Sequence, residues 1–303
     1  MNNKPIIFPL FDYDELALAI QKDCHYELGR MKQHQFPDGE TVFKIETEVT
    51  NRPVLFIASL DTPNPKIVPL LFAAETARAL GATKVILIAP YLAYMRQDKV
   101  FEKGQGITSQ YFAKLISHYF DGLITIDPHL HRWHSLNAVY EIPTEVLHAT
   151  KPIAHWIRNN IQQPLLIGPD EESRQWVKTI ADEAQAPCVI LEKNRKGDRS
   201  VDVSIPNLDL YPGKTPILID DIISTGMTMI ETVRHVHSLN LPPPVCIGVH
   251  AIFSGDAYQQ ILAGGVDKII TCNTVRHCSN TIDISHEIIQ SLRTLSWLDQ
   301  GIG

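Results

Sequence analysis

The stretch that decides the fold runs from Ile217 to Thr228 and reads ILIDDIISTGMT. An apolar strand is followed by two acids, and a turn rich in Ser, Thr and Gly then opens a helix near Met229. Ligands of open α/β sheets bind at the carboxyl ends of strands, where we expect this turn to lie. Backbone N–H groups and hydroxyls at the start of a helix suit a phosphate. The acids suit sugar hydroxyls or a hydrated Mg²⁺, and a plain helix cap is the alternative interpretation.

The rest of the chain repeats this rhythm of apolar strands and helical stretches. Continuous apolar runs recur at residues 54–58, 85–89, 122–126, 165–167, 189–191, 245–249 and 268–270. Strands without polar alternation, separated by amphipathic helices, predict an α/β protein whose parallel sheets are covered on both faces. A chain of 303 residues suits two domains, and the pattern is interrupted near residues 141–150. We therefore expect one domain over residues 1–147 and a second over residues 148–303.

Composition excludes several classes of protein. The net charge of −7 argues against nucleic acid as a partner, because binding to a phosphate backbone requires a basic surface. No apolar run reaches the ~18 residues of a membrane span, and the first residues lack the pattern of a signal peptide, so we expect a cytoplasmic protein with no membrane partner. Five scattered cysteines without a C-x-x-C pair argue against a disulfide framework and against a zinc knuckle.

Two more segments of the sequence narrow the function that this turn could serve. The first is FPDGE from Phe36 to Glu40, and the second is YMRQDK from Tyr94 to Lys99. Each alone is weak, because Pro-Asp-Gly is an ordinary turn and the second segment could be a solvated loop. Together with Ile217–Thr228, in this order and spacing, they resemble the ribose-phosphate pyrophosphokinase family. Its phosphoribosyl-diphosphate loop is shared with type I phosphoribosyltransferases.

The resemblance implies two type I phosphoribosyltransferase-like domains, each a mainly parallel sheet flanked by helices. It also implies an ATP site drawn from adjoining subunits, and hence a homo-oligomer. By resemblance the ATP-binding residues are Phe36, Asp38, Glu40, Arg96, Gln97 and Asp98. The ribose 5-phosphate-binding residues are Asp170, Asp220, Asp221, Ser224, Thr225, Gly226 and Thr228.

Three strand ends complete the implied site. His129 would bind a Mg²⁺ that bridges the ATP phosphates, and Asp170 would lie near the ribose and a second metal ion. Lys193 and Arg195 match the Lys-x-Arg start of the family's mobile catalytic loop. From the residues alone, three alternatives stay open: a transition-metal site at His129 and its neighbouring histidines, a helix cap by Asp170, and a solvated charge run around Lys193.

The implied reaction is the Mg²⁺-dependent transfer of the β,γ-diphosphate of ATP to the anomeric hydroxyl of ribose 5-phosphate. The chain departs from the family pattern at Ser224, at Met227 and at Arg132-Trp133-His134. Two rival hypotheses therefore stay open. One is a phosphoribosyltransferase, which would not depend on ATP, and the other is a catalytically silent regulatory partner of such a synthase.

Overall fold

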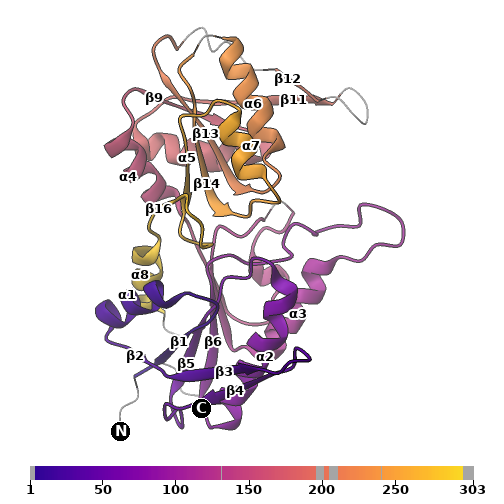
Figure 1. Ribbon diagram of the computed structural model, residues 1–303, viewed down its shortest axis with the longest axis vertical. Helices are drawn as coiled ribbons and strands as arrows, with labels where there is room; N and C mark the ends of the chain where they lie inside the picture. Colours follow the sequence, from indigo (N-terminus) through magenta and orange to yellow (C-terminus); the bar gives the residue numbers. More distant parts are fainter. Residues whose placement is uncertain (1–3, 131, 196–200, 205–210, 240, 296–303) are drawn as a thin grey trace. The chain divides into compact units, whose positions relative to one another are not determined.

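The computed structural model describes residues 4–130, 132–195, 201–204, 211–239 and 241–295, with the backbone alone for 172, 192–195 and 201–204. The chain forms two compact units (Figure 1). Unit 1 contains Met1–Leu147 and Ser285–Gly303, and unit 2 contains His148–Ile284. Within the described part of the chain, no helix combines the length and apolar character needed to cross a membrane.

Unit 1 is built on a six-stranded sheet in the order β2-β1-β5-β6-β7-β8, with every neighbouring pair parallel. Its strands are β1 (Ile6–Pro9), β2 (Glu27–Leu28), β5 (Pro53–Ile57), β6 (Lys84–Ala89), β7 (Gly122–Ile126) and β8 (Thr144–Leu147). Its helices are α1 (Asp14–Cys24), α2 (Pro63–Ala79), α3 (Thr108–Tyr119), α8 (Ser285–Thr294) and the short η1 (Leu136–Ala138). An antiparallel hairpin of β3 (Met31–Gln35) and β4 (Thr41–Ile45) stands apart from this sheet.

Unit 2 repeats the design, with the strand order β10-β9-β13-β14-β15-β16 and parallel pairing throughout. Its strands are β9 (Pro164–Gly168), β10 (Cys188–Ile190), β13 (Thr215–Ile223), β14 (Val245–Ala251), β15 (Lys268–Cys272) and β16 (Asn280–Ile282). Its helices are α4 (Thr150–Asn160), η2 (Glu171–Ser173), α5 (Arg174–Ala184), α6 (Met227–Ser238) and α7 (Ala257–Ala263). A two-stranded antiparallel ribbon joins β11 (Glu192–Arg195) to β12 (Val201–Ser204).

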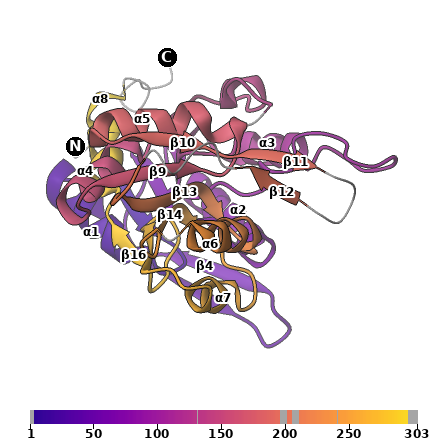
Figure 2. The ribbon, with the colours of Figure 1, turned by 90° about the horizontal axis from the view of Figure 1, so that it is seen from above.

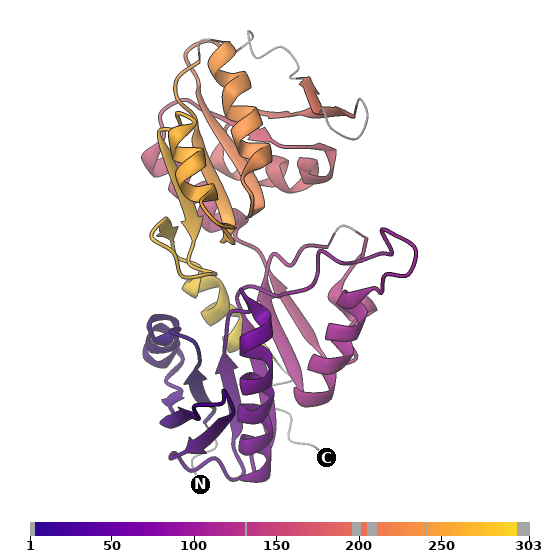
Figure 3. The ribbon, with the colours of Figure 1, turned by 45° about the vertical axis from the view of Figure 1, so that its right-hand side comes forward.

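Helices cover both faces of each sheet, which explains why the strands lack polar alternation. In unit 2, α5 lies on one face and α6 and α7 lie on the other (Figure 2). In unit 1, α8 packs beside α1 (Figure 3), and α2 contacts α3. Val54, Leu55, Phe56 and Ile57 on β5 are fully buried between these layers. The structure thus confirms the predicted fold class of parallel sheets flanked by helices.

One boundary differs from the prediction, which assigned residues 148–303 to the second domain. The chain does divide between Leu147 and His148, but helix α8 belongs to unit 1. Tyr26 donates a hydrogen bond to the Leu292 carbonyl at 3.3 Å, and Arg293 donates to the Asp23 carbonyl at 2.8 Å. An amphipathic helix can cover any apolar face, so its sequence did not indicate which unit it would join.

Strand β13 is also longer than predicted. The sequence suggested that the strand ends before Asp220, but β13 continues to Ile223. Its pairing with β14 matches Asp220 to Gly248 and Ile223 to Ala251. The neighbouring strand therefore holds the two acids inside the ladder, and only the residues after Ile223 form the turn.

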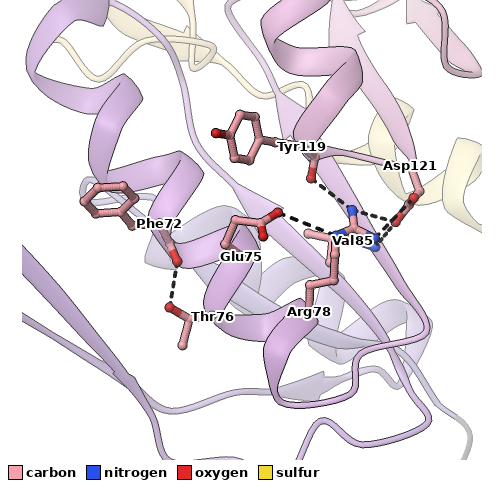
Figure 4. Close-up of polar contacts among 7 residues, drawn as sticks. All are labelled: Phe72, Glu75, Thr76, Arg78, Val85, Tyr119 and Asp121. Atoms are coloured by element: carbon pink, nitrogen blue, oxygen red, sulfur yellow. Dashed lines mark hydrogen bonds and ion pairs between the residues drawn. The ribbon is translucent and has the colours of Figure 1, made fainter.

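A cluster of polar contacts ties the amino ends of β6 and β7 to α2 (Figure 4). An Arg78 guanidinium nitrogen lies 3.2 Å from Asp121 Oδ2 and donates a hydrogen bond to the Tyr119 carbonyl at 3.1 Å. Asp121 in turn accepts a hydrogen bond from the Val85 N–H at 2.7 Å. The cluster lies at the end of the sheet opposite to the carboxyl ends of the strands, where ligands of α/β sheets bind.

Candidate active site

In unit 2, the acids lie where the strand order reverses. Strands β9 and β13 are neighbours, and their helical connections leave in opposite directions along the sheet. Such a switch point is where open α/β sheets bind ligands. Asp170 lies two residues beyond β9, and Asp220 and Asp221 lie near the carboxyl end of β13. The structure therefore brings together, at one edge of one sheet, three acids that the sequence predicted for the sugar site.

The surroundings of Asp220 disfavour its ionised form. Burial raises the pKa of the Asp220 carboxyl well above its usual range, and the negative charges of Asp221 and Asp170 raise it further. Asp170 also accepts a hydrogen bond from the Ser173 N–H at 3.1 Å, so it caps η2 as the alternative interpretation expected. Capping uses one oxygen lone pair and leaves carboxylate capacity for another ligand.

The turn after β13 has a backbone conformation that suits an anion. Gly226 adopts a φ of +71° and directly precedes α6, whose first N–H groups have no partner within the helix. A Cβ at Gly226 would lie 2.7 Å from Ile261 Cδ1, so the turn packs closely on α7. Met227 is 53% exposed, and its side chain therefore does not fill the turn.

A neighbouring loop supports this turn. The Ser254 N–H donates to the Ser224 carbonyl at 3.2 Å, and the hydroxyl oxygens of the two serines are also 3.2 Å apart. Thr225 is exposed and Thr228 is partly exposed. Ser254 was not predicted from the sequence, because the β14–α7 loop carries no recognisable motif and Ser254 is 30 residues from Ser224.

Lys193 and Arg195 lie on β11 of the antiparallel ribbon, opposite Val203 and Val201 of β12 (Figure 1). The ribbon follows β10, the edge strand next to β9, so it begins on the same side of the sheet as Asp170. The side chains of Lys193 and Arg195 lie outside the described part of the structure, and so do residues 196–200. Their catalytic role stays a prediction.

In unit 1, the hairpin β3–β4 presents the predicted adenine-binding segment at its tip. The Phe36 N–H donates to the Glu40 carbonyl at 2.8 Å, and Gly39, with a φ of +93°, closes the turn. Asp38 accepts a hydrogen bond from the Glu40 N–H at 3.1 Å. Phe36 is 43% exposed and meets the His34 ring edge-on at 4.7 Å. The hairpin therefore displays an accessible aromatic ring, which a nucleotide base can stack on.

The remaining nucleotide segments follow two neighbouring strands of unit 1. Arg96 and Gln97 come after β6 and are exposed, whereas His129 comes after β7 and is partly buried. Asp98, predicted with them as an ATP-binding residue, has a side chain that is only 3% exposed and lies 3.5 Å from Arg132. The structure thus gives Asp98 a contact within the protein that the sequence did not predict.

The histidine and acidic side chains of the site limit how a divalent metal ion could bind. Among the described side chains, no group of three or more His, Cys, Asp or Glu is arranged to hold a metal ion. Mg²⁺, however, needs only one or two carboxylates when water and substrate phosphates complete its octahedron. Burial and the negative charges of Asp221 and Asp170 raise the pKa of Asp220, and a nearby cation would favour its ionised form. Asp170 and Asp220 therefore fit a hydrated Mg²⁺ better than a metal cage made only of protein ligands.

The two parallel sheets, with a Ser/Thr/Gly turn at the switch point of the second, define a protein made of two type I phosphoribosyltransferase-like domains. The N-terminal domain profile of ribose phosphate pyrophosphokinase matches residues 6–119, and a phosphoribosyl transferase domain profile matches residues 135–284.

Known relatives extend this match over the chain. A ribose-phosphate pyrophosphokinase of Saccharolobus solfataricus is 32% identical, covering 90% of this chain and 95% of the relative. A ribose-phosphate pyrophosphokinase of Methanopyrus kandleri is 28% identical, covering 93% of this chain and 96% of the relative. The crystal structure of phosphoribosylpyrophosphate synthetase from Mycobacterium smegmatis superposes with a TM-score of 0.83 and covers 96% of this chain and 98% of that chain. The two sequences are 21% identical, so this similarity shows a shared fold. The chain belongs to the ribose-phosphate pyrophosphokinase family, as its sequence predicted.

Proposed function

We propose that this protein transfers the β,γ-diphosphate of ATP to the anomeric hydroxyl of ribose 5-phosphate, giving phosphoribosyl diphosphate and AMP. One observation carries the proposal. A single chain holds both the turn at residues 224–228, which suits a sugar phosphate, and a second unit of the same fold, whose strand ends present Arg96, Gln97 and His129. A phosphoribosyltransferase needs only the turn and one such unit. The relatives named ribose-phosphate pyrophosphokinase, which match across both units, support the same function.

Unit 2 would bind the sugar. The N–H groups at the start of α6 and the hydroxyls of Ser224, Thr225 and Thr228 suit the 5-phosphate. Asp220 and Asp221 suit the ribose hydroxyls, because carboxylates accept hydrogen bonds. Burial and the neighbouring negative charges raise the pKa of Asp220, so bound hydroxyl donors or a cation would favour its ionised form.

Unit 1 would bind the nucleotide. Phe36 would stack on the adenine, with Asp38 and Glu40 on its edge or on the ribose. Arg96 and Gln97 would contact the phosphates, because a guanidinium fork matches phosphate oxygens. In the transfer, a bond forms between the anomeric oxygen and the β-phosphorus, and the bond from that phosphorus to the α,β-bridging oxygen breaks. AMP leaves with the bridging oxygen, and the hydroxyl proton is released to solvent.

Such a transfer depends on alignment and on charge neutralisation more than on covalent catalysis. Lys193 and Arg195 would neutralise charge that develops on the transferring group. His129 would hold one Mg²⁺ and Asp170 a second, and each ion would neutralise phosphate charge when it is bound. A cytoplasmic location stays a prediction from the sequence.

A homo-oligomer is part of the proposal, and an exposed apolar surface of unit 1 supports it. A groove of about 380 Å³ between α2 and α3 is lined by Asn64, Ile67, Val68, Tyr94, Thr108, Tyr111, Phe112 and Leu115. Val68 and Tyr111, together with nearby Phe72 on α2, are each at least half exposed. Contiguous apolar surface of this kind is typical of an interface between proteins. Sedimentation of the purified protein tests the assembly, and a monomer at micromolar concentration would contradict it.

The activity is tested by incubating the protein with ATP, Mg²⁺ and ribose 5-phosphate and measuring AMP by chromatography, with each component omitted in turn. We expect AMP and a diphosphorylated sugar only in the complete mixture. A Thr228→Val variant should raise the KM for ribose 5-phosphate, whereas Thr179→Val on the exposed face of α5 should not. ATP binding without AMP production would favour the regulatory partner. Consumption of phosphoribosyl diphosphate with a base, independent of ATP, would favour a phosphoribosyltransferase.

A further inference from the structure

Arg96 and Gln97 are exposed between two buried side chains. Met95 precedes them and is 1% exposed, and the nearly buried Asp98 follows them. The backbone between these ends is fixed as well. The Gln97 N–H donates to the Tyr94 carbonyl at 3.2 Å, and the Gln97 carbonyl accepts a hydrogen bond from an α3 N–H at 3.2 Å. The two exposed side chains therefore project from a short turn whose ends are anchored inside unit 1.

Both buried ends contact the same later segment, residues 132–140, which we call the brace. Arg132 Nη1 lies 3.5 Å from Asp98 Oδ2, and Tyr140 Oη donates to Met95 Sδ at 4.0 Å. Tyr140 is buried, and burial raises the pKa of its hydroxyl, which therefore keeps its proton and can donate. The brace begins three residues after His129, so it connects the two strand ends that carry the nucleotide residues of unit 1.

The Asp98–Arg132 pair also has a clear energetic role. A carboxylate removed from water is unfavourable unless a cation or hydrogen-bond donors compensate its charge. Arg132 is the one cation that pairs with Asp98 among the described residues. Arg132 itself is 44% exposed and so loses little hydration in forming this contact. The pair therefore fixes the Asp98 end of the turn more strongly than a surface ion pair would.

We propose that the brace is a positioning element for Arg96 and Gln97. Arg132 acts through the buried carboxylate at one end of the turn, and Tyr140 acts through the buried thioether at the other. The role in nucleotide binding rests on the function proposed above. A side chain held on a fixed backbone loses less conformational entropy on binding than one on a mobile loop, so the brace raises affinity for phosphate groups. The rival arrangement is direct contact between the Arg132 guanidinium and the phosphates.

A double-mutant cycle separates the two arrangements. The dissociation constant of Mg²⁺·ATP is measured by calorimetric titration for Asp98→Asn, Arg132→Met and the double variant. If Arg132 acts through Asp98, each single variant weakens binding about tenfold and the double variant also about tenfold. Arg132→Lys should recover most of the affinity, and the affinity for ribose 5-phosphate should not change. A loss of about a hundredfold in the double variant would mean that Arg132 contacts ATP independently, and this result would overturn the proposal.

Arg78→Met provides a matched control. Arg78 is also partly exposed and paired with an aspartate of unit 1, but it lies at the opposite end of the sheet (Figure 4). Its loss should lower the melting temperature without changing the affinity for ATP. An equal loss of ATP affinity in Arg78→Met and Arg132→Met would show a general destabilisation and would overturn the positioning role.

Hydrogen exchange tests the brace without any nucleotide. In Arg132→Met and in Tyr140→Phe, the amides of Gln97 and Ser109, which are hydrogen-bonded in this turn, should exchange faster than in Arg78→Met. Unchanged exchange in both brace variants would overturn the proposal, whatever the activity of the enzyme. If exchange accelerates but the unmodified protein binds no ATP, the brace stands and the function proposed above fails.

Discussion

Replacing Gly226 by alanine tests how the turn at residues 224–228 is built. Gly226 has a φ of +71°, and a Cβ there would lie 2.7 Å from Ile261 Cδ1 and 2.9 Å from Ile261 Cγ1. A left-handed backbone costs a residue with a Cβ about 1–2 kcal/mol. Forcing an extra methyl group into a packed contact costs about 1–3 kcal/mol more. We therefore expect Gly226→Ala to lower the free energy of unfolding by about 2–5 kcal/mol.

Gly213 supplies the control for this experiment. Its φ of +74° nearly equals that of Gly226, but no described atom beyond its chain neighbours lies within 4 Å of the position that a Cβ would take. Gly213→Ala should therefore cost only the backbone strain of about 1–2 kcal/mol. The difference between the free energies of unfolding of the two variants gives the cost of the close contact with α7.

The assay is urea unfolding of both variants, together with the KM for ribose 5-phosphate. Gly226→Ala should raise this KM, because a displaced turn no longer aligns its N–H groups with the phosphate, whereas Gly213→Ala should not. Adding Ile261→Val, which removes the Cδ1 methyl, should restore part of the stability of Gly226→Ala. Equal costs for the two glycine variants, or no recovery with Ile261→Val, would refute the reasoning.

Three further predictions concern stability, pH and catalysis. Arg78→Met should lower the free energy of unfolding by about 1 kcal/mol, as measured by thermal melts. Lys32→Met, which breaks the more exposed pair with Glu46, should lower it by clearly less, and equal effects would contradict this. The folded state raises the pKa of Asp220 above its usual 3.8, so the folded protein binds more protons than the unfolded chain in this pH range. The free energy of unfolding should therefore fall as pH rises from about 3.8 through the raised pKa. Urea titrations across this range should show a flatter dependence for Asp220→Asn, and an unchanged slope would exclude Asp220 as the cause. Lys193→Ala should reduce kcat far more than it weakens ATP binding, and similar losses in both would count against a role in the transition state.

Much of the site could be predicted because its residues are close in sequence. The turn from Ser224 to Thr228 follows its strand directly, and the hairpin tip at Phe36 is a local turn. Contacts across the fold could not be predicted in this way. Arg132 and Asp98 are 34 residues apart, and only the parallel pairing of β6 with β7 brings the segments after these strands together. A single sequence without relatives contains no signal for such a pair.

The sequence by itself determined the α/β class, the positions of most core strands and the family. These follow from local patterns, because a continuous apolar run is stable only where both faces of a strand are covered. Only the tertiary structure decided that α8 joins unit 1, that β13 extends through Asp220 and Asp221, and that Asp98 is buried against Arg132. Each of these depends on which distant surface a segment meets. That choice is set by the packing of the whole unit, and no local stretch of sequence specifies it.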